Sequence, residues 1–164
     1  MKRGEKGFTL IEILIVLAIS GAIIWPVTMA TITLMTNPQR STEQNVVLQE
    51  VQNVGYWISR DVQMARTVTP SEPNGFPLIL DIPIDTDENN DYRIDYLFDG
   101  NKIKREVYDS SETLISETFI ADYINTDNTT FITLDPVIGF HKFIIKASRG
   151  STTLTRSYGV SQRL

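Results

Sequence analysis

The stretch Lys6-Gly7-Phe8-Thr9-Leu10-Ile11-Glu12 joins a short basic leader to an apolar segment that runs to Met35. Glu12 is the only charged residue between Phe8 and Met35. A charged side chain inside a bilayer costs roughly 2.5 to 3.5 kcal/mol on insertion scales. A carboxylate at this position therefore indicates a function, and it requires a positively charged partner.

The helical repeat suggests what that partner is. If the chain is cut after Gly7, the new amine of Phe8 lies one helical turn before Glu12, because residues four apart share a helix face. The amine and the carboxylate then pair either within one chain or between neighbouring chains. The second arrangement would give subunits a fixed register along a filament.

This N-terminus resembles the type III signal sequence of type IV prepilins and of the pseudopilins of type II secretion systems. The resemblance implies that Gly7 precedes the cut, that Phe8 becomes an N-methylated N-terminus and that Glu12 acts in assembly. It also implies processing by a membrane-bound prepilin peptidase and methyltransferase on the cytoplasmic side. One departure concerns the helix proline, which many family members carry slightly further along than Pro26.

Other N-terminal signals explain the stretch less well. A secretory signal peptide has an apolar core of roughly 7 to 15 residues, and this run is about twice as long. A lipoprotein signal is excluded because the chain has no cysteine. A plain signal anchor explains the apolar length but neither Gly7 nor Glu12. The alternative function that stays open is therefore a membrane-anchored, monomeric, extracytoplasmic binding or sensor domain.

Charge divides the 164-residue chain into two parts. Residues 1–36 carry a net charge of +1 and the whole chain carries −5, so the remaining residues carry −6. A basic leader is typical of an N-terminus held in the cytoplasm, which places the folded part across the membrane. An acidic domain is a poor ligand for phosphate backbones, so no direct nucleic-acid partner is expected. The absence of cysteine also excludes disulfides and thiolate chemistry.

The apolar segment predicts a transmembrane helix. Residues 13–35 span roughly 34 Å as a helix, which is about one hydrocarbon thickness. Pro26 should bend this helix by removing one backbone hydrogen bond. The mid-segment position of Trp25 favours helix packing over an interfacial anchor. Small residues that admit a neighbouring helix are Ser20, Gly21, Ala22 and Ala30, and hydroxyls able to bond backbone carbonyls are those of Thr28, Thr31 and Thr33.

A second, amphipathic helix is predicted after a break or bend at Asn37-Pro38. Ser41 and Gln44 have the spacing of a capping box. Apolar residues then recur at steps of three and four, which indicates a face that packs on the rest of the domain: Val47, Val51, Val54, Ile58, Val62 and Ala65. The stretch 59–66 also resembles the helix end of J-type minor pseudopilins.

Beyond Pro70 the pattern alternates, which predicts strands. The expected strands are 77–84, 92–98, 102–108, 114–120, 131–134, 140–147 and 152–160, with turns at 99–101 and 149–151. The expected core face of the second is Tyr92, Ile94, Tyr96 and Phe98. We expect an α+β, pilin-like fold, in which one long helix packs on one antiparallel or mixed sheet. Its parts are a leader (1–7), an assembly helix (8–36), an amphipathic helix (37–66) and a β-rich domain (67–164).

Two features of the sequence bear on metal binding. Asp85, Asp87, Asn89 and Asp91 alternate as in the first part of a calcium loop, but the later positions of that pattern do not match. A solvated acidic hairpin loop is therefore favoured over calcium, and no cofactor is expected. The single histidine, His141, is expected at the surface or at a strand edge.

No phosphate loop, dinucleotide fingerprint or nucleophile elbow is present in the sequence, so an enzyme is not expected. The resemblance implies a structural filament subunit whose partners are the prepilin peptidase, other pilin or pseudopilin subunits, an assembly platform protein and the membrane. The weak resemblance at 59–66 and the long β-rich region favour a minor subunit. A pilus, a secretion system and a competence system all remain open.

Overall fold

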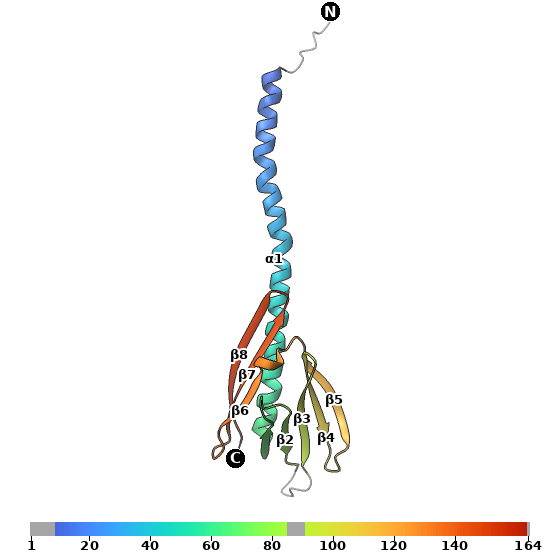
Figure 1. The fold of residues 1–164 in the computed structure, drawn as a ribbon. Coiled ribbons are helices and arrows are strands. Elements are labelled where there is room, and N and C mark those ends of the chain that lie inside the picture. The colour runs from blue at the N-terminus through green and yellow to red at the C-terminus, as the bar shows by residue number, and fades with distance from the viewer. Residues whose placement is uncertain (1–8, 85–90, 164) are drawn as a thin grey trace, which may run out of the picture. The chain divides into compact units, whose positions relative to one another are not determined.

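The computed structural model describes residues 9–84 and 91–163, and only the backbone of residues 36–40. Within these described residues there is one long helix, α1 (Leu10–Met64), followed by eight strands and a short 3₁₀ helix, η2 (Thr126–Asn128) (Figure 1). The chain divides into two compact units, Met1–Ser41 and Thr42–Leu164, and α1 contributes to both. The predicted α+β, pilin-like arrangement of a long N-terminal helix followed by antiparallel sheet is confirmed.

The first unit contains a helix segment able to cross a membrane by its length and composition, Leu10–Met35. Its threonine hydroxyls donate to backbone carbonyls one turn earlier, as expected in an apolar segment. Thr28 Oγ1 lies 2.8 Å from the Ile24 oxygen, and Thr31 Oγ1 lies 2.9 Å from the Val27 oxygen. Each hydroxyl is satisfied by a hydrogen bond within the helix. The threonine methyl groups therefore face outward, and the surface of the segment stays apolar.

Of the break or bend predicted at Asn37-Pro38, the break is wrong, because α1 continues through this dipeptide. A bend at this position stays a prediction. Proline removes only one backbone N–H, and it disfavours helix chiefly at the residue before it. Here more than twenty helical residues lie on each side. Cooperative hydrogen bonding on both sides outweighs the local penalty, and Ser41 lies inside the helix instead of capping a new one.

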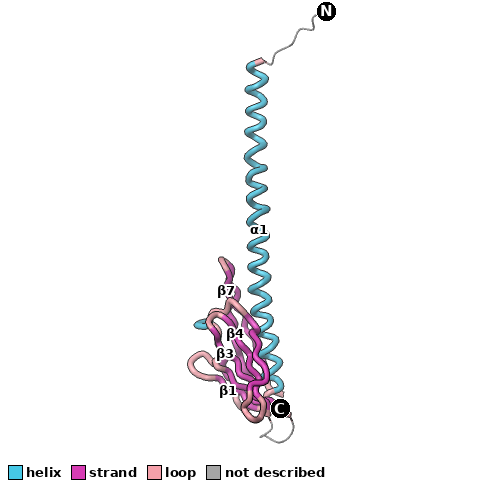
Figure 2. The backbone as a smooth tube through the Cα atoms, turned by 90° about the vertical axis from the view of Figure 1, so that its right-hand side faces the viewer, coloured by secondary structure: helices cyan, strands magenta, loops and turns pink. Residues whose placement is uncertain are grey.

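The second unit contains two antiparallel sheets beside residues 42–64 of α1, and the strands lie on one side of this segment (Figure 2). The five-stranded sheet has the order β1 (Thr67–Pro70), β2 (Leu78–Ile82), β3 (Tyr92–Asp99), β4 (Lys102–Tyr108) and β5 (Leu114–Ala121). The three-stranded sheet has the order β6 (Thr130–Asp135), β7 (Phe140–Arg149) and β8 (Thr152–Ser161). The expectation of a single sheet was therefore wrong: the strands pair only with sequence neighbours within each group, and η2 lies between the groups.

The predicted helix stripe forms the centre of the core. Val47, Val51, Val54, Ile58 and Val62 are fully buried. They pack in one cluster with residues from both sheets, including Leu78, Leu80, Tyr96, Ile103, Phe131, Phe143 and Ile145. Burying each such aliphatic side chain stabilises the fold by roughly 1.5 to 3 kcal/mol. The amphipathic half of the helix is thus the element on which both sheets assemble.

Strand β3 follows the predicted alternation at Ile94, Tyr96 and Phe98, but Asp95 between them is also buried. Ile94 and Tyr96 are buried, and Phe98 packs against the core. Tyr92, which was expected on the same core face, is 41% exposed. It pairs with Ile82 at the end of β2, where the strand pair leaves the core.

A buried polar network connects α1 to the middle of the larger sheet. The Asp61 side chain is buried, and its Oδ2 accepts hydrogen bonds from the Tyr96 hydroxyl at 2.5 Å and from Arg105 Nε at 2.7 Å. The Arg105 guanidinium also lies 5.1 Å from the centre of the Trp57 ring. Burial, together with the neighbouring Asp61 carboxylate, raises the pKa of Tyr96 well above its usual value, so the phenol remains a donor.

His141 is buried, contrary to the prediction of a surface or strand-edge residue. It lies on β7, the central strand of the smaller sheet, and alternation places it on the same face as Phe143 and Ile145. The Thr133 hydroxyl lies 3.0 Å from His141 Nδ1, and Gln162 Oε1 lies 3.4 Å from Nε2. Gln162 Nε2 in turn donates to the Ala65 carbonyl at 3.1 Å, just past the end of α1. His141 can be buried at this position because both of its ring nitrogens have hydrogen-bonding partners.

Burial lowers the pKa of His141 below its usual 6.5, although the hydrogen bond with Gln162 opposes this shift. The folded chain therefore favours neutral His141 more than the unfolded chain does. The stability from this preference is fully present above pH 6.5 and should be lost progressively as the pH falls below it. We expect the free energy of unfolding, measured by urea denaturation between pH 7.5 and 5.5, to fall toward pH 5.5. The His141→Gln variant should show a smaller fall, and equal slopes in both proteins would contradict this assignment.

Candidate functional site

The residues at the start of α1 form the first candidate site. Gly7 and Phe8, the predicted cleavage positions, lie outside the described residues. Thr9 and Glu12 are described, and α1 begins between them. The Thr9 carbonyl accepts hydrogen bonds from the backbone N–H groups of Glu12 at 3.0 Å and Ile13 at 3.3 Å. Thr9 is therefore the residue that caps the helix.

The Glu12 carboxylate folds back onto this cap. Its Oε2 accepts from the backbone N–H of Thr9 and from the Thr9 hydroxyl, each at 3.4 Å. A glutamate three residues after a capping threonine is the sequence pattern of a capping box. The pattern Thr9-x-x-Glu12 was visible in the sequence, but its capping role was not predicted. The long distances indicate weak bonds.

The geometry leaves Glu12 able to bind a second donor. An ionised carboxylate has about four acceptor positions. The two bonds from Thr9 both use Oε2. Glu12 also lies in the first turn, where the helix dipole favours a negative charge. The carboxylate therefore lies at the start of the apolar segment with acceptor capacity that the two weak bonds from Thr9 do not use.

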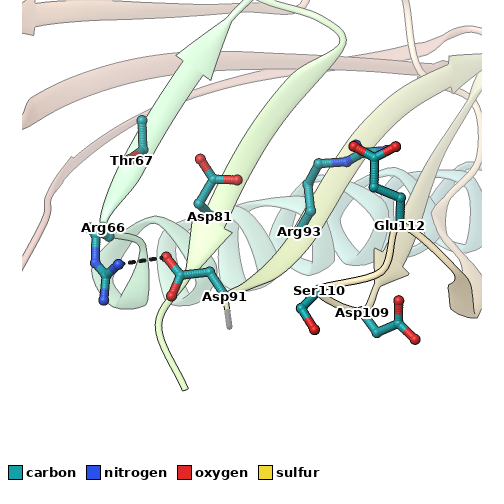
Figure 3. Close-up of a pocket in the computed structure, with 8 residues that line it drawn as sticks. All are labelled: Arg66, Thr67, Asp81, Asp91, Arg93, Asp109, Ser110 and Glu112. Carbon is teal, nitrogen blue, oxygen red and sulfur yellow. Dashed lines mark hydrogen bonds and ion pairs between the residues drawn. The ribbon is translucent and has the colours of Figure 1, made fainter. Parts of the chain in front are cut away.

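A second candidate site is a polar pocket of about 480 Å³ in the C-terminal unit (Figure 3). Strands β2 and β3 and the loop after β4 bring together four carboxylates and two guanidinium groups. The residues that line it are Arg66, Thr67, Asp81, Asp91, Arg93, Asp109, Ser110 and Glu112. Sequence reasoning missed this pocket, because its residues are separated by up to 46 positions and no local pattern connects them.

Ion pairs hold the walls of the pocket. Arg66 Nη1 lies 3.1 Å from Asp91 Oδ2, a pair that Figure 3 shows at one end. Arg93 Nη1 lies 3.4 Å from Glu112 Oε1. Burial raises the pKa of Asp81, and the charge of Asp91 raises it further. Such ion pairs near the surface contribute little to the stability of the fold.

The predicted calcium loop is only partly described. Asp85, Asp87 and Asn89 lie outside the described residues, and Asp91 is paired with Arg66. Among residues 9–84 and 91–163, no group of three or more His, Cys, Asp or Glu side chains is placed to hold a metal ion. The preference for a solvated acidic loop over a calcium site therefore stays a prediction.

Comparison with known proteins locates a family signature at the N-terminus. Residues 2–28 match the family model described as the prokaryotic N-terminal methylation motif. Neither the curated proteins nor the solved structures give a match. The matched region includes Gly7, Phe8, Glu12 and much of the apolar helix. An apolar N-terminal helix with this motif fits an inner-membrane anchor. The chain thus carries the N-terminal segment of a type IV prepilin- or pseudopilin-like protein.

Proposed function

We propose that the chain is a structural subunit, of the minor class, in a type IV pilus or a type II secretion-like filament. The observation that carries the proposal is the methylation motif at residues 2–28 together with the apolar helix segment Leu10–Met35. This combination supplies both a processing signal and a segment that remains in the membrane. The two-sheet domain after it has a large surface for contacts with other subunits.

Processing is the first step of the proposed function. The basic leader stays in the cytoplasm, and the domain formed by residues 42–164 is extracytoplasmic. A prepilin peptidase cuts the bond between Gly7 and Phe8 and methylates the new amine of Phe8. The start of the helix supports this step. Thr9 caps α1, which begins at Leu10, so Thr9 is the single residue between the proposed new N-terminus, Phe8, and the helix.

Assembly is the second step, and Glu12 is its central residue. A platform protein in the membrane brings subunits together, and the amine of Phe8 pairs with the carboxylate of Glu12 on a neighbouring subunit. Inside an apolar bundle such a pair neutralises two charges that each would be costly alone. The geometry of Glu12 supports this role, since the weak bonds from Thr9 use only Oε2 and leave Oε1 as an acceptor.

Intact mass of the protein purified from the membranes of its own host tests the processing step. We expect a mass corresponding to residues 8–164, with or without one added methyl group. A matched variant, Gly7→Leu, should retain residues 1–7, because the side chain before the cut would no longer fit a site that accepts glycine. A wild-type mass that retains Met1 to Gly7 would contradict the proposal and favour a plain signal anchor.

A further inference from the structure

The polar pocket of the C-terminal unit carries more negative than positive charge. Its lining holds four carboxylates and two guanidinium groups, a net formal charge of −2. Both guanidinium groups already have acidic partners. Arg66 Nη1 lies 3.1 Å from Asp91 Oδ2, and Arg93 Nη1 lies 3.4 Å from Glu112 Oε1. The pocket therefore has an excess of acceptor groups over cationic donors.

Asp91 supplies one of these acceptors, and it is buried. Its side chain is 10% exposed, so nine-tenths of it is out of contact with water. Oδ2 pairs with Arg66, whereas Oδ1 has no hydrogen-bond partner among the described residues. An unpaired buried carboxylate oxygen is costly, because it has lost its water without gaining a donor. Since Asp91 lines the pocket, a donor that enters the pocket would satisfy Oδ1.

Asp81 supplies a second acceptor. It lies on β2 directly opposite Arg93 of β3, which is the position of a cross-strand ion pair. That pair does not form, because Arg93 extends toward Glu112 and away from Asp81 (Figure 3). Within the described part of the chain, the Asp81 side chain makes no hydrogen bond or ion pair. Burial, and then the charge of Asp91, raise the pKa of Asp81. A cation bound beside Asp81 and Asp91 would therefore be stabilised by both charges.

The spread of the carboxylates decides which cation fits. No group of three or more His, Cys, Asp or Glu side chains in residues 9–84 and 91–163 is placed to hold a metal ion. The pocket volume of about 480 Å³ is typical of sites for small organic ligands, which occupy roughly 300 to 1,000 Å³. A guanidinium group carries five N–H donors in a planar fork, so it can bridge carboxylates that do not converge on one point. An ammonium group is a compact point charge and needs convergent acceptors.

We propose that this pocket binds a guanidinium group, whose N–H groups donate to the Asp81 carboxylate and to Asp91 Oδ1. The two arginines of the pocket keep their present partners and form its walls. The hydroxyls of Thr67 and Ser110, which line the same pocket, are further acceptors. The guanidinium group belongs either to a free small molecule or to an arginine side chain of another protein. Because the pocket lies within residues 42–164, the inference does not depend on processing or on assembly.

Isothermal titration calorimetry of the purified full chain, in detergent and at low ionic strength, tests the proposal. The probe is N-acetyl-L-arginine amide, which is compared with the corresponding lysine and citrulline amides. Citrulline has nearly the shape of arginine but no charge. We expect saturable binding of the arginine ligand, about tenfold weaker binding of the lysine ligand and no binding of the citrulline ligand. No saturable binding of the arginine ligand, or equal affinity for either comparison ligand, would overturn the proposal.

Two substitutions place the binding in this pocket. Asp81→Asn keeps the shape of the side chain and removes its charge, and we expect about tenfold weaker binding of the arginine ligand. The matched control is Asp99→Asn, because Asp99 is exposed at the other end of β3 and does not line the pocket. Ser110→Trp, at an exposed position of the pocket wall, should block entry without changing any carboxylate. Wild-type affinity in both Asp81→Asn and Ser110→Trp would place the binding elsewhere and overturn the site.

A peptide distinguishes the two sources of the guanidinium group. The end-blocked peptide Ala-Ala-Arg-Ala-Ala carries the same side chain on an extended backbone. Binding at least as tight as that of N-acetyl-L-arginine amide supports an arginine of another protein as the ligand. Exclusion of the peptide, with the small ligand still bound, supports a free small molecule. A chain that is processed to residues 8–164 but binds no arginine ligand would overturn this inference and leave the proposed function standing.

Discussion

Replacing Glu12 by glutamine is expected to leave the start of α1 intact but to prevent incorporation of the chain into a filament. Glutamine retains an acceptor oxygen that can reach back to Thr9, and the capping-box pattern accepts either glutamate or glutamine. It lacks the charge, so the Phe8 ammonium of the neighbouring subunit would remain unpaired in an apolar bundle. A penalty of roughly 2.5 to 3.5 kcal/mol corresponds to about a hundredfold loss of incorporation.

The measurement is the fraction of Glu12→Gln chains recovered in sheared or purified filaments relative to membranes, co-expressed with the wild-type chain. Thr9→Ala is the matched control, because it removes the cap hydroxyl and keeps the carboxylate. That control should lose about 1 kcal/mol of helix capping and still assemble. Normal incorporation of Glu12→Gln would show that the cap, and not the charge, explains why a glutamate occurs here.

Replacing Asp61 by alanine is expected to be the most destabilising single change in the C-terminal unit. Asp61 Oδ2 binds both the Tyr96 hydroxyl and Arg105 Nε, and all three groups lie between α1 and the larger sheet. Removing one partner of a buried ion pair typically costs 3 to 5 kcal/mol, because the other charge is left uncompensated. We expect a loss of about this size in the free energy of unfolding.

Urea denaturation in detergent, followed by Trp57 fluorescence in a Trp25→Phe background, measures this loss. Trp57 is a suitable reporter because the Arg105 guanidinium lies 5.1 Å from its ring centre. The matched control is Arg60→Ala, since the exposed Arg60 also lies over Trp57 but makes no bond to Asp61. This control should cost less than about 1 kcal/mol. A loss for Asp61→Ala no larger than that of the control would show that the network adds no net stability.

The sequence predicted those features that depend on local patterns. The apolar segment, the motif Gly7-Phe8-Thr9-Leu10-Ile11-Glu12 and the stripe from Val47 to Ala65 each span a single continuous stretch. The same holds for the strands: β4 (Lys102–Tyr108) was predicted with its observed bounds, and six others within a few residues. The helical period of 3.6 residues and the strand period of 2 depend only on residues close together in the sequence. They can therefore be recognised without knowledge of the tertiary contacts. The short strand β1 was missed because four residues are too few to show a period.

Only the tertiary structure decided which distant groups meet and which polar side chains are buried. Asp61 and His141 look like surface residues in a sequence, yet each is buried because residues far along the chain satisfy its polar atoms. The division of the strands into two sheets and the charged pocket around Arg66 and Arg93 likewise depend on contacts between separate elements. The physical reason is that burial of a polar group is favourable only when its partners are present, and partners at long sequence separation leave no local periodicity. The sequence by itself thus determined the membrane helix and its processing motif, while the folded domain alone determined the architecture of the surface that other subunits would meet.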